Sequence, residues 1–125
     1  MPGWFLIFLG GGTGAVCRFA LNNLVGRALG TAFPYGTLAV NLLGALLIGA
    51  IVEIIALKLS ASEQLRFLLV TGFLGGFTTF SAFSLEAALM LERGDLRQLA
   101  CYIAASVIGT IALVFLGTWL VRQAV

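Results

Sequence analysis

Polar side chains recur inside otherwise apolar stretches of this chain, at spacings that place them on one face of a helix. Tyr102, Ser106 and Thr110 follow one another every four residues, and Ser81 and Ser84 are three residues apart. A single serine in a membrane helix usually donates to its own backbone. Hydroxyl stripes on two helices, with an asparagine on a third, instead indicate a narrow polar path for a small ion.

Asn41 is that asparagine, and it shares a helical face with Thr37, Gly44 and Ile48. Its amide offers two N–H donors and one carbonyl acceptor, and inside a bilayer it must find a partner. A hydrogen bond between two helices would satisfy it. A donor aimed at an anion in a pore is the functional alternative, and the sequence leaves both interpretations open.

Two aromatic residues, Phe80 and Phe83, are three residues apart and also share a face. Core packing explains most aromatic pairs of this kind. An aromatic ring has a negative face and a positive edge. Two rings that present their edges to a conduit would favour a desolvated anion without a full positive charge, which suits conduction because the ion must leave as well as enter.

The stretch 71–84 combines an apolar composition with residues that weaken a helix. Gly75 and Gly76 stand beside two consecutive threonines. Glycine costs a helix about 1 kcal/mol relative to alanine, and β-branched residues resist helical rotamers. We therefore predict a membrane helix that is broken near 75–79, which would free backbone carbonyls and amides for an ion. The alternative is that the glycines only let helices pack closely.

Four stretches are long enough to hold these residues in a bilayer, since a span needs about 20 apolar residues. They cover about residues 4–29, 36–57, 65–91 and 99–121. The whole chain is 61% hydrophobic and 10% charged, whereas soluble domains carry about 25% charged residues. We predict an all-α membrane protein with four transmembrane helices per chain, the third of them broken, in a single domain over residues 1–125.

Positive charge does not favour one orientation of these spans. With four spans, both termini and the connection around 58–66 share one side of the membrane. The positive residues are Lys58, Arg66 and Arg122 on that side, and Arg27, Arg93 and Arg97 on the other. Because a Lys/Arg bias normally sets orientation, its absence predicts that the chain inserts both ways and pairs as an antiparallel dimer. The alternative is that Arg18 or a partner protein sets the orientation.

Two charged residues lie deep within the spans, Arg18 in the first and Glu86 in the third. Such charges are costly and suggest function. They could pair with each other or with partner carbonyls, and a structural pair near an interface is the plainer interpretation. Close packing is predicted at three pairs of glycines spaced by four: Gly10/Gly14, Gly26/Gly30 and Gly72/Gly76.

Taken together, these motifs resemble the small bacterial fluoride channels, the Fluc or CrcB-like family. The resemblance covers nearly the whole chain and rests on residues 11–19, 36–44 and 71–86. It implies a channel rather than an enzyme, located in the bacterial inner (plasma) membrane. Such a channel would passively export fluoride from the cytoplasm and so lower its toxicity. The resemblance also implies a dual-topology antiparallel homodimer with two separate pores.

The resemblance further implies roles for individual residues. Phe80 and Phe83 would line fluoride sites by their ring edges, and Asn41 would donate to the ion. The remaining pathway residues would be Ser81, Tyr102, Ser106 and Thr110 in a polar track, with Arg18 toward the aqueous approach.

A structural sodium ion is implied at the dimer centre, held by carbonyls of Gly75 and Thr78 from both subunits. This agrees with the predicted break, because hard cations take oxygen ligands and broken helices supply them. One departure from the family pattern is Ala82, which stands where a threonine is usual, so one hydroxyl of the track is missing.

Two other functions compete with a channel. Small multidrug exporters are also short four-span proteins that insert both ways, but they couple transport to protons through a glutamate in the first span. Here the first span holds Arg18 and no acid, and Glu86 is the deeply placed carboxyl. A subunit that assembles with others and transports nothing is the second alternative.

The balanced charges generate the first prediction. A reporter fused to the C-terminus should be found on both sides of the membrane, because neither orientation is favoured by the positive-inside rule. The measurement compares a reporter that is active only outside the cytoplasm with one that is active only inside. Extra lysines placed in the 58–62 connection serve as the control, since they should shift the fusion to one side. A reporter found on one side only in the unaltered chain would contradict dual insertion.

Overall fold

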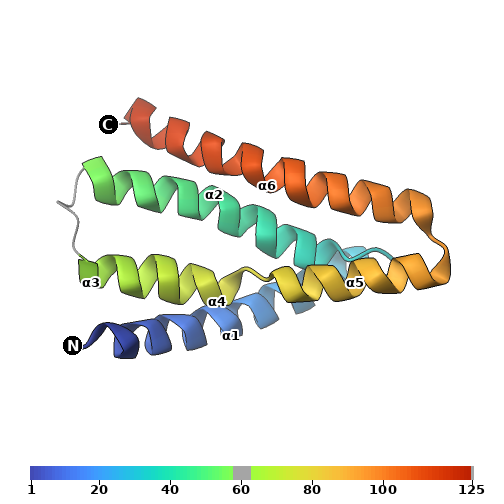
Figure 1. Cartoon of the computed structure of the whole chain (residues 1–125), viewed down its shortest axis with the longest axis horizontal. Coiled ribbons are helices and arrows are strands. Elements are labelled where there is room, and N and C mark those ends of the chain that lie inside the picture. The colour runs from blue at the N-terminus through green and yellow to red at the C-terminus, as the bar shows by residue number, and fades with distance from the viewer. Residues whose placement is uncertain (58–62, 125) are drawn as a thin grey trace.

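The computed structural model describes residues 1–57 and 63–124, and the regular elements of these residues are helices (Figure 1). In chain order the helices are α1 (Gly3–Leu29), α2 (Tyr35–Leu57), α3 (Glu63–Arg66), the π-helix η1 (Phe67–Leu74), α4 (Gly75–Phe77), α5 (Phe80–Arg93) and α6 (Leu96–Ala124). The predicted all-α class is confirmed for this part of the chain.

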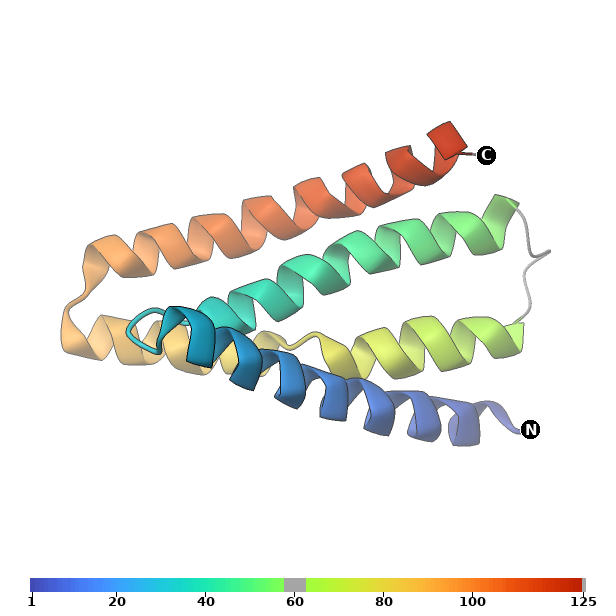
Figure 2. The ribbon, with the colours of Figure 1, turned by 180° about the vertical axis from the view of Figure 1, so that it is seen from behind.

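Four helical stretches are long and apolar enough to cross a membrane, as predicted. They are α1, α2, the composite stretch Glu63–Arg93 and α6. Both termini lie at the same end of the molecule, as an even number of spans requires (Figures 1 and 2). The connection at 58–62, which holds Lys58, lies outside the described residues.

The third span is broken, and the break lies at Thr78 and Thr79. Thr78 has φ −86° and ψ 158°, and Thr79 has φ −151° and ψ 124°, so both are extended. The helix resumes at Phe80, where the Thr79 hydroxyl accepts a hydrogen bond from the backbone N–H of Ala82 at 3.2 Å. This is a normal N-terminal cap. The predicted break is thus confirmed at the threonines, whereas Gly75 and Gly76 remain helical in α4.

Glycines bring α1 into backbone contact with the first half of the third span. A Cβ at Gly10 or Gly14 would overlap the backbone of Phe73, and one at Gly76 would overlap the carbonyl of Gly11. The predicted close packing at these positions is confirmed. Gly76, just before the break, is therefore used for contact with α1.

A second close approach, between α2 and α6, was not predicted. A Cβ at Gly49 would overlap the carbonyl of Val114, and a Cβ at Gly117 would overlap the carbonyl of Leu46. Gly49 and Gly117 lie on different helices, and neither has a second glycine four residues away in its own span. The contact fixes α6 against α2 along the half of the bundle that contains the termini (Figure 1).

The prediction of close packing at Gly26 and Gly30 is wrong. The nearest atom to a Cβ at Gly26 would be the Thr31 side chain at 3.8 Å, an ordinary contact, and nothing lies within 4 Å at Gly30. Gly30 instead ends α1 with a positive φ of 84°, a conformation that glycine adopts without strain. The chain then turns, and α2 begins at Tyr35, directly after Pro34.

The order of helices across the bundle is α6, α2, the third span and α1 (Figures 1 and 2). The first half of the third span contributes Leu74 and Phe77 to a buried cluster with Val40 of α2. In the second half, Phe83 packs with Tyr102 in another cluster. The break therefore separates two small cores, and its two threonines line a pocket together with residues of α2 and α6.

Candidate functional site

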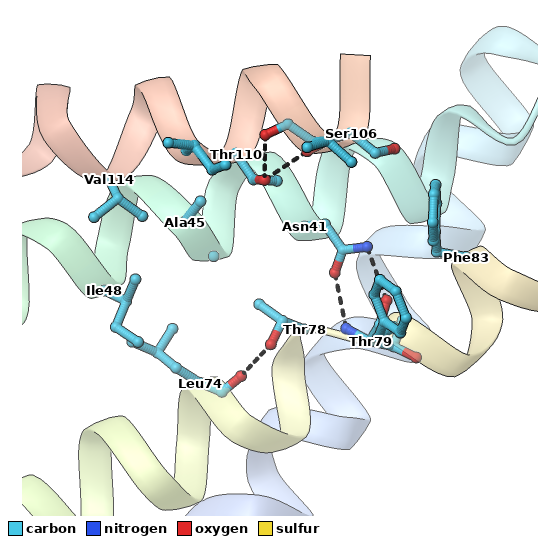
Figure 3. A pocket seen from close by; sticks show the side chains of 14 residues that line it. Asn41, Ala45, Ile48, Leu74, Thr78, Thr79, Phe83, Ser106, Thr110 and Val114 are labelled. Atoms are coloured by element: carbon cyan, nitrogen blue, oxygen red, sulfur yellow. Dashed lines mark hydrogen bonds between the residues drawn. The ribbon is translucent and has the colours of Figure 1, made fainter. Parts of the chain in front are cut away.

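Asn41 joins α2 to the broken helix through two hydrogen bonds (Figure 3). Its amide nitrogen donates to the carbonyl of Thr79 at 2.9 Å, and its amide oxygen accepts from the N–H of Thr79 at 2.8 Å. The side chain thus replaces the helical partners that Thr79 lacks at the break. The helix-joining interpretation of Asn41 is confirmed, and one of its two N–H donors is left for another acceptor.

A pocket of about 380 Å³ opens beside this contact, between α2, the break, α5 and α6. Fourteen residues line it, as Figure 3 shows: Asn41, Gly44, Ala45, Ile48, Leu74, Thr78, Thr79, Phe80, Phe83, Ser106, Val107, Thr110, Ile111 and Val114. The lining is mostly apolar, with a few hydroxyls and one amide. A small ion in this pocket would meet few polar groups, so each of them has a large effect on which ion is accepted.

The two phenylalanines flank this pocket, with ring centroids 5.4 Å apart and ring planes tilted by 38°. Phe83 is 8% exposed and also contacts Tyr102, with centroids 5.0 Å apart. Phe80 is 76% exposed in the single chain. One ring is therefore fixed by the core, and the other stands on the open side of the pocket.

Two of the three predicted α6 hydroxyls line the pocket. Thr110 donates to the carbonyl of Ser106 in its own helix at 2.5 Å. The Ser106 hydroxyl is buried, and no hydrogen-bond partner reaches it from the described residues. An unpaired buried hydroxyl costs about 1–3 kcal/mol, and Ser106 is one of the residues that line the pocket.

Tyr102 and Ser81, the other predicted hydroxyls, are not among the residues that line the pocket. Tyr102 is fully buried between the rings of Phe33 and Phe83, and its hydroxyl also lacks a hydrogen-bond partner in the described part of the chain. Ser81 is exposed and lies 3.3 Å from the Thr79 hydroxyl. A single chain does not bring Ser81 to the pocket.

Arg18 binds the carbonyl of Gly76, just before the break, with its Nε at 3.0 Å. It does not pair with Glu86, which instead accepts a hydrogen bond from the Thr37 hydroxyl at 2.5 Å. Of the two partners left open for Arg18, the structure shows a carbonyl and not Glu86. Arg18 lines neither this pocket nor the second one described below.

The carbonyls of Gly75 and Thr78 have lost their helical donors at the break. In an unbroken helix they would accept from Thr79 and Ala82, but these N–H groups donate to Asn41 and to the Thr79 hydroxyl. Gly75 is also exposed in the single chain. Carbonyl oxygens suit a hard cation, and the described residues hold no group of three or more His, Cys, Asp or Glu that could serve instead.

A second, more polar pocket of about 680 Å³ lies at the end of the molecule where α1 turns into α2. Its lining includes Asn22, Asn23, Arg27 and Arg93, and it reaches the Thr37–Glu86 hydrogen bond. Sequence reasoning missed this pocket. The adjacent asparagines near the end of an apolar span were the signal that could have found it.

Comparison with known proteins identifies the family of this chain. A sequence model described as "CrcB-like protein, Camphor Resistance (CrcB)" matches residues 5–118. The chain belongs to the CrcB-like family. Several curated relatives are named "Fluoride-specific ion channel FluC". The one from Chelativorans sp. (strain BNC1) is 52% identical over 118 residues, which cover 94% of each chain. The one from Rhodopseudomonas palustris (strain BisB5) is 50% identical over 119 residues, which cover 95% of this chain and 96% of the relative. Another relative of that name, from Agrobacterium fabrum, is 50% identical over 118 residues and 94% of each chain.

The Asn41 contact in this CrcB-like protein generates a stability prediction. Asn41→Ala should lower the free energy of unfolding by about 1–3 kcal/mol, because it leaves the buried N–H and carbonyl of Thr79 without partners. Thermal unfolding in detergent measures the change. Thr13→Ala is the matched control, since the Thr13 hydroxyl only supplements the backbone of its own helix at Leu9. Equal stability of the two variants would show that Asn41 does not hold the break.

Proposed function

We propose that this chain is a fluoride-selective ion channel that passively exports fluoride from the cytoplasm and so lowers its toxicity. The observation that carries the proposal is the pocket beside the break, which is lined by two phenylalanines, the amide residue Asn41 and the hydroxyl residues of α6. The names of the relatives, which match along almost their whole length, support the same function.

The chemistry of the pocket suits a small, strongly hydrated anion that has been stripped of water. The positive ring edges of Phe80 and Phe83 offer weak attraction, and Ser106 and the second N–H of Asn41 offer hydrogen bonds. Tyr102 and Thr110 would extend this polar track along α6, and Ser81 would join it beside the break. None of these groups is a full charge, which lets the ion leave as readily as it enters.

The assembly we propose is an antiparallel homodimer of oppositely inserted chains, with two pores. Three observations support it: the balanced positive charges, the exposed Phe80 ring on the open side of the pocket, and the exposure of Gly75 beside it. A second copy seated on this face would cover the ring and close the pocket. Residues of both chains would then surround each ion.

A structural sodium ion at the centre of this dimer is part of the proposal. Gly75 and Thr78 from two copies would supply four carbonyl oxygens, which is the ligand type that a hard cation takes. The donors that these carbonyls would meet in an unbroken helix are already used elsewhere. The ion would hold the two breaks together and would not be transported.

Passive export follows from membrane electrostatics in the bacterial inner (plasma) membrane. Hydrogen fluoride crosses a bilayer as the neutral acid and dissociates inside, where the charge of fluoride traps it. A membrane potential that is negative inside drives the anion out with about 2.3 kcal/mol per charge per 100 mV. No coupling to another energy source is then required.

A proton-coupled exporter of the small multidrug type finds little support in the geometry. Its chemistry needs a carboxyl in the substrate path, and Glu86 lies away from the pocket beside the break, bound to Thr37. The first span contributes Arg18 to the break instead of an acid. The relatives carry the name of a channel.

Efflux from liposomes tests the function directly. The purified protein should release fluoride but not chloride, as measured with ion-selective electrodes. Replacing both Phe80 and Phe83 with Ile should slow fluoride efflux by about tenfold or more, because both positive ring edges are lost, and the dimer should still assemble. Phe8→Ile, on an exposed face of α1, is the matched control. Unchanged efflux in the double variant would refute the role of the ring edges, and absence of fluoride efflux in the unaltered protein would refute the channel.

Removal of sodium tests the proposed central ion. We expect the dimer to dissociate or efflux to stop when sodium is replaced by a larger cation during purification, because the carbonyls of Gly75 and Thr78 would lose their shared ligand. Gel filtration and the liposome assay measure the two outcomes, and elemental analysis confirms that the ion has left. A sodium-free protein that still forms dimers and conducts would rule out this site.

A further inference from the structure

The pocket beside the break (the break pocket) and the polar pocket at the turn from α1 to α2 (the turn pocket) lie close together without sharing a lining residue. On α2, Thr37 lines the turn pocket and Asn41 the break pocket. On α5, Glu86 lines the turn pocket and Phe83 the break pocket. Four residues of helix rise about 6 Å and three rise about 4.5 Å. The layer of protein between the two pockets is therefore about one helical turn thick.

Tyr102 fills this layer. Its side chain is fully buried and lines neither pocket. Its ring centroid lies 5.0 Å from that of Phe83, which lines the break pocket, and 5.6 Å from that of Phe33, which lines the turn pocket. Phe80 follows Phe83 at 5.4 Å. A row of four rings in contact thus connects one pocket with the other.

Phe33 differs from the other rings of this row because no helix holds it. It belongs to the connection between α1 and α2, whereas the other three rings belong to α5 and α6. Its ring is half-buried, meets Tyr102 at an interplanar angle of 83°, and contacts Tyr35 with centroids 4.9 Å apart. Because Phe33 lines the turn pocket and Tyr102 does not, the Phe33 ring covers Tyr102 on that side.

The turn pocket has the character of an aqueous approach. It lies at the end of the bundle, holds about 680 Å³, and is lined by the exposed residues Arg27 and Arg93, which attract an anion. Glu86, the acid among its lining residues, is hydrogen-bonded to Thr37. An anion in the break pocket would reach this approach by passing the layer that Tyr102 fills.

We propose that Phe33 is a positioning residue that holds Tyr102 closed against the turn pocket and so makes this layer part of the ion selectivity. The inference rests on the proposed function. A tightly packed layer admits a small anion more readily than a larger one, and ring edges replace part of the water that the ion loses. Fluoride, which is smaller than chloride, passes such a layer, and chloride is rejected by its size.

Phe33→Ala tests the selectivity. The change removes the ring that covers Tyr102, so we expect chloride efflux from liposomes to become measurable while fluoride efflux does not slow. The ratio of fluoride to chloride efflux should fall by about tenfold or more, a loss of about 1.4 kcal/mol of discrimination. Phe33→Tyr keeps the ring and should behave as the unaltered protein. Phe5→Ala is the matched control, because Phe5 is also half-buried and contacts one ring, that of Trp4, but lines neither pocket.

Water access to Tyr102 provides a measurement that does not depend on transport. The chain has two tyrosines, and Tyr35 is 41% exposed whereas Tyr102 is 0% exposed. Hydroxyl radicals formed in water, with mass spectrometry to locate the product, should label Tyr35 and spare Tyr102 in the unaltered protein. Phe33→Ala should raise the labelling of Tyr102 toward that of Tyr35. A generally loosened fold would also raise the labelling of Phe77, which is buried in the other core.

The inference requires both changes in Phe33→Ala. An unchanged ratio of fluoride to chloride efflux, a Tyr102 that stays protected, or a parallel rise in the labelling of Phe77 would overturn it. If Phe33→Ala does not assemble, Phe33→Val, which keeps part of the apolar contact, decides by the same two measurements. Failure of both variants to assemble would show that the ring serves folding, and would overturn a separate role in selectivity.

The two proposals fail in distinguishable ways. If the unaltered protein releases no fluoride, the channel is refuted, and the labelling of Tyr102 still shows whether Phe33 closes the layer. If the unaltered protein releases fluoride and Phe33→Ala discriminates against chloride equally well, the channel stands and the role of Phe33 falls.

Discussion

The structure depends on how a broken helix satisfies its backbone inside a membrane. With no water in the hydrocarbon region, each unpaired N–H or carbonyl costs several kcal/mol, so a break survives where the surrounding protein or a polar cavity satisfies the freed groups. Here three side chains satisfy some of these groups, two from neighbouring helices and one from the break itself. Asn41 of α2 binds both backbone groups of Thr79, Arg18 of α1 binds the carbonyl of Gly76, and the Thr79 hydroxyl caps α5. The neighbouring helices thus hold the break open from two sides.

Close helix packing is the second requirement, and glycine meets it. α1 contacts the first half of the third span through glycines on both elements, and α2 contacts α6 through Gly49 and Gly117. Van der Waals contact, and not the hydrophobic effect, drives association of helices in lipid, so these backbone contacts carry much of the stability. α6 is held against α2 and away from the break, and the pocket occupies the space between them.

The pocket is only partly enclosed by one chain. Phe83 is fixed by its contact with Tyr102, whereas Phe80 stands exposed, and the Ser106 hydroxyl has no partner in the described residues. In the proposed dimer, a second copy would cover Phe80 and complete the pocket.

The sequence by itself determined the four spans, the all-α class and the position of the break to within a few residues, because hydrophobic length and helix-weakening residues are local properties of the chain. It also singled out Asn41, Phe80, Phe83, Ser106 and Thr110, which the fold brings to one pocket. Only the tertiary structure decided that Arg18 binds a carbonyl and not Glu86, that Ser81 stays outside the pocket, and that Gly49 and Gly117 join α2 to α6. The physical reason is that each of these outcomes depends on which distant segment lies opposite a residue, and periodicity along one helix carries no information about its partner.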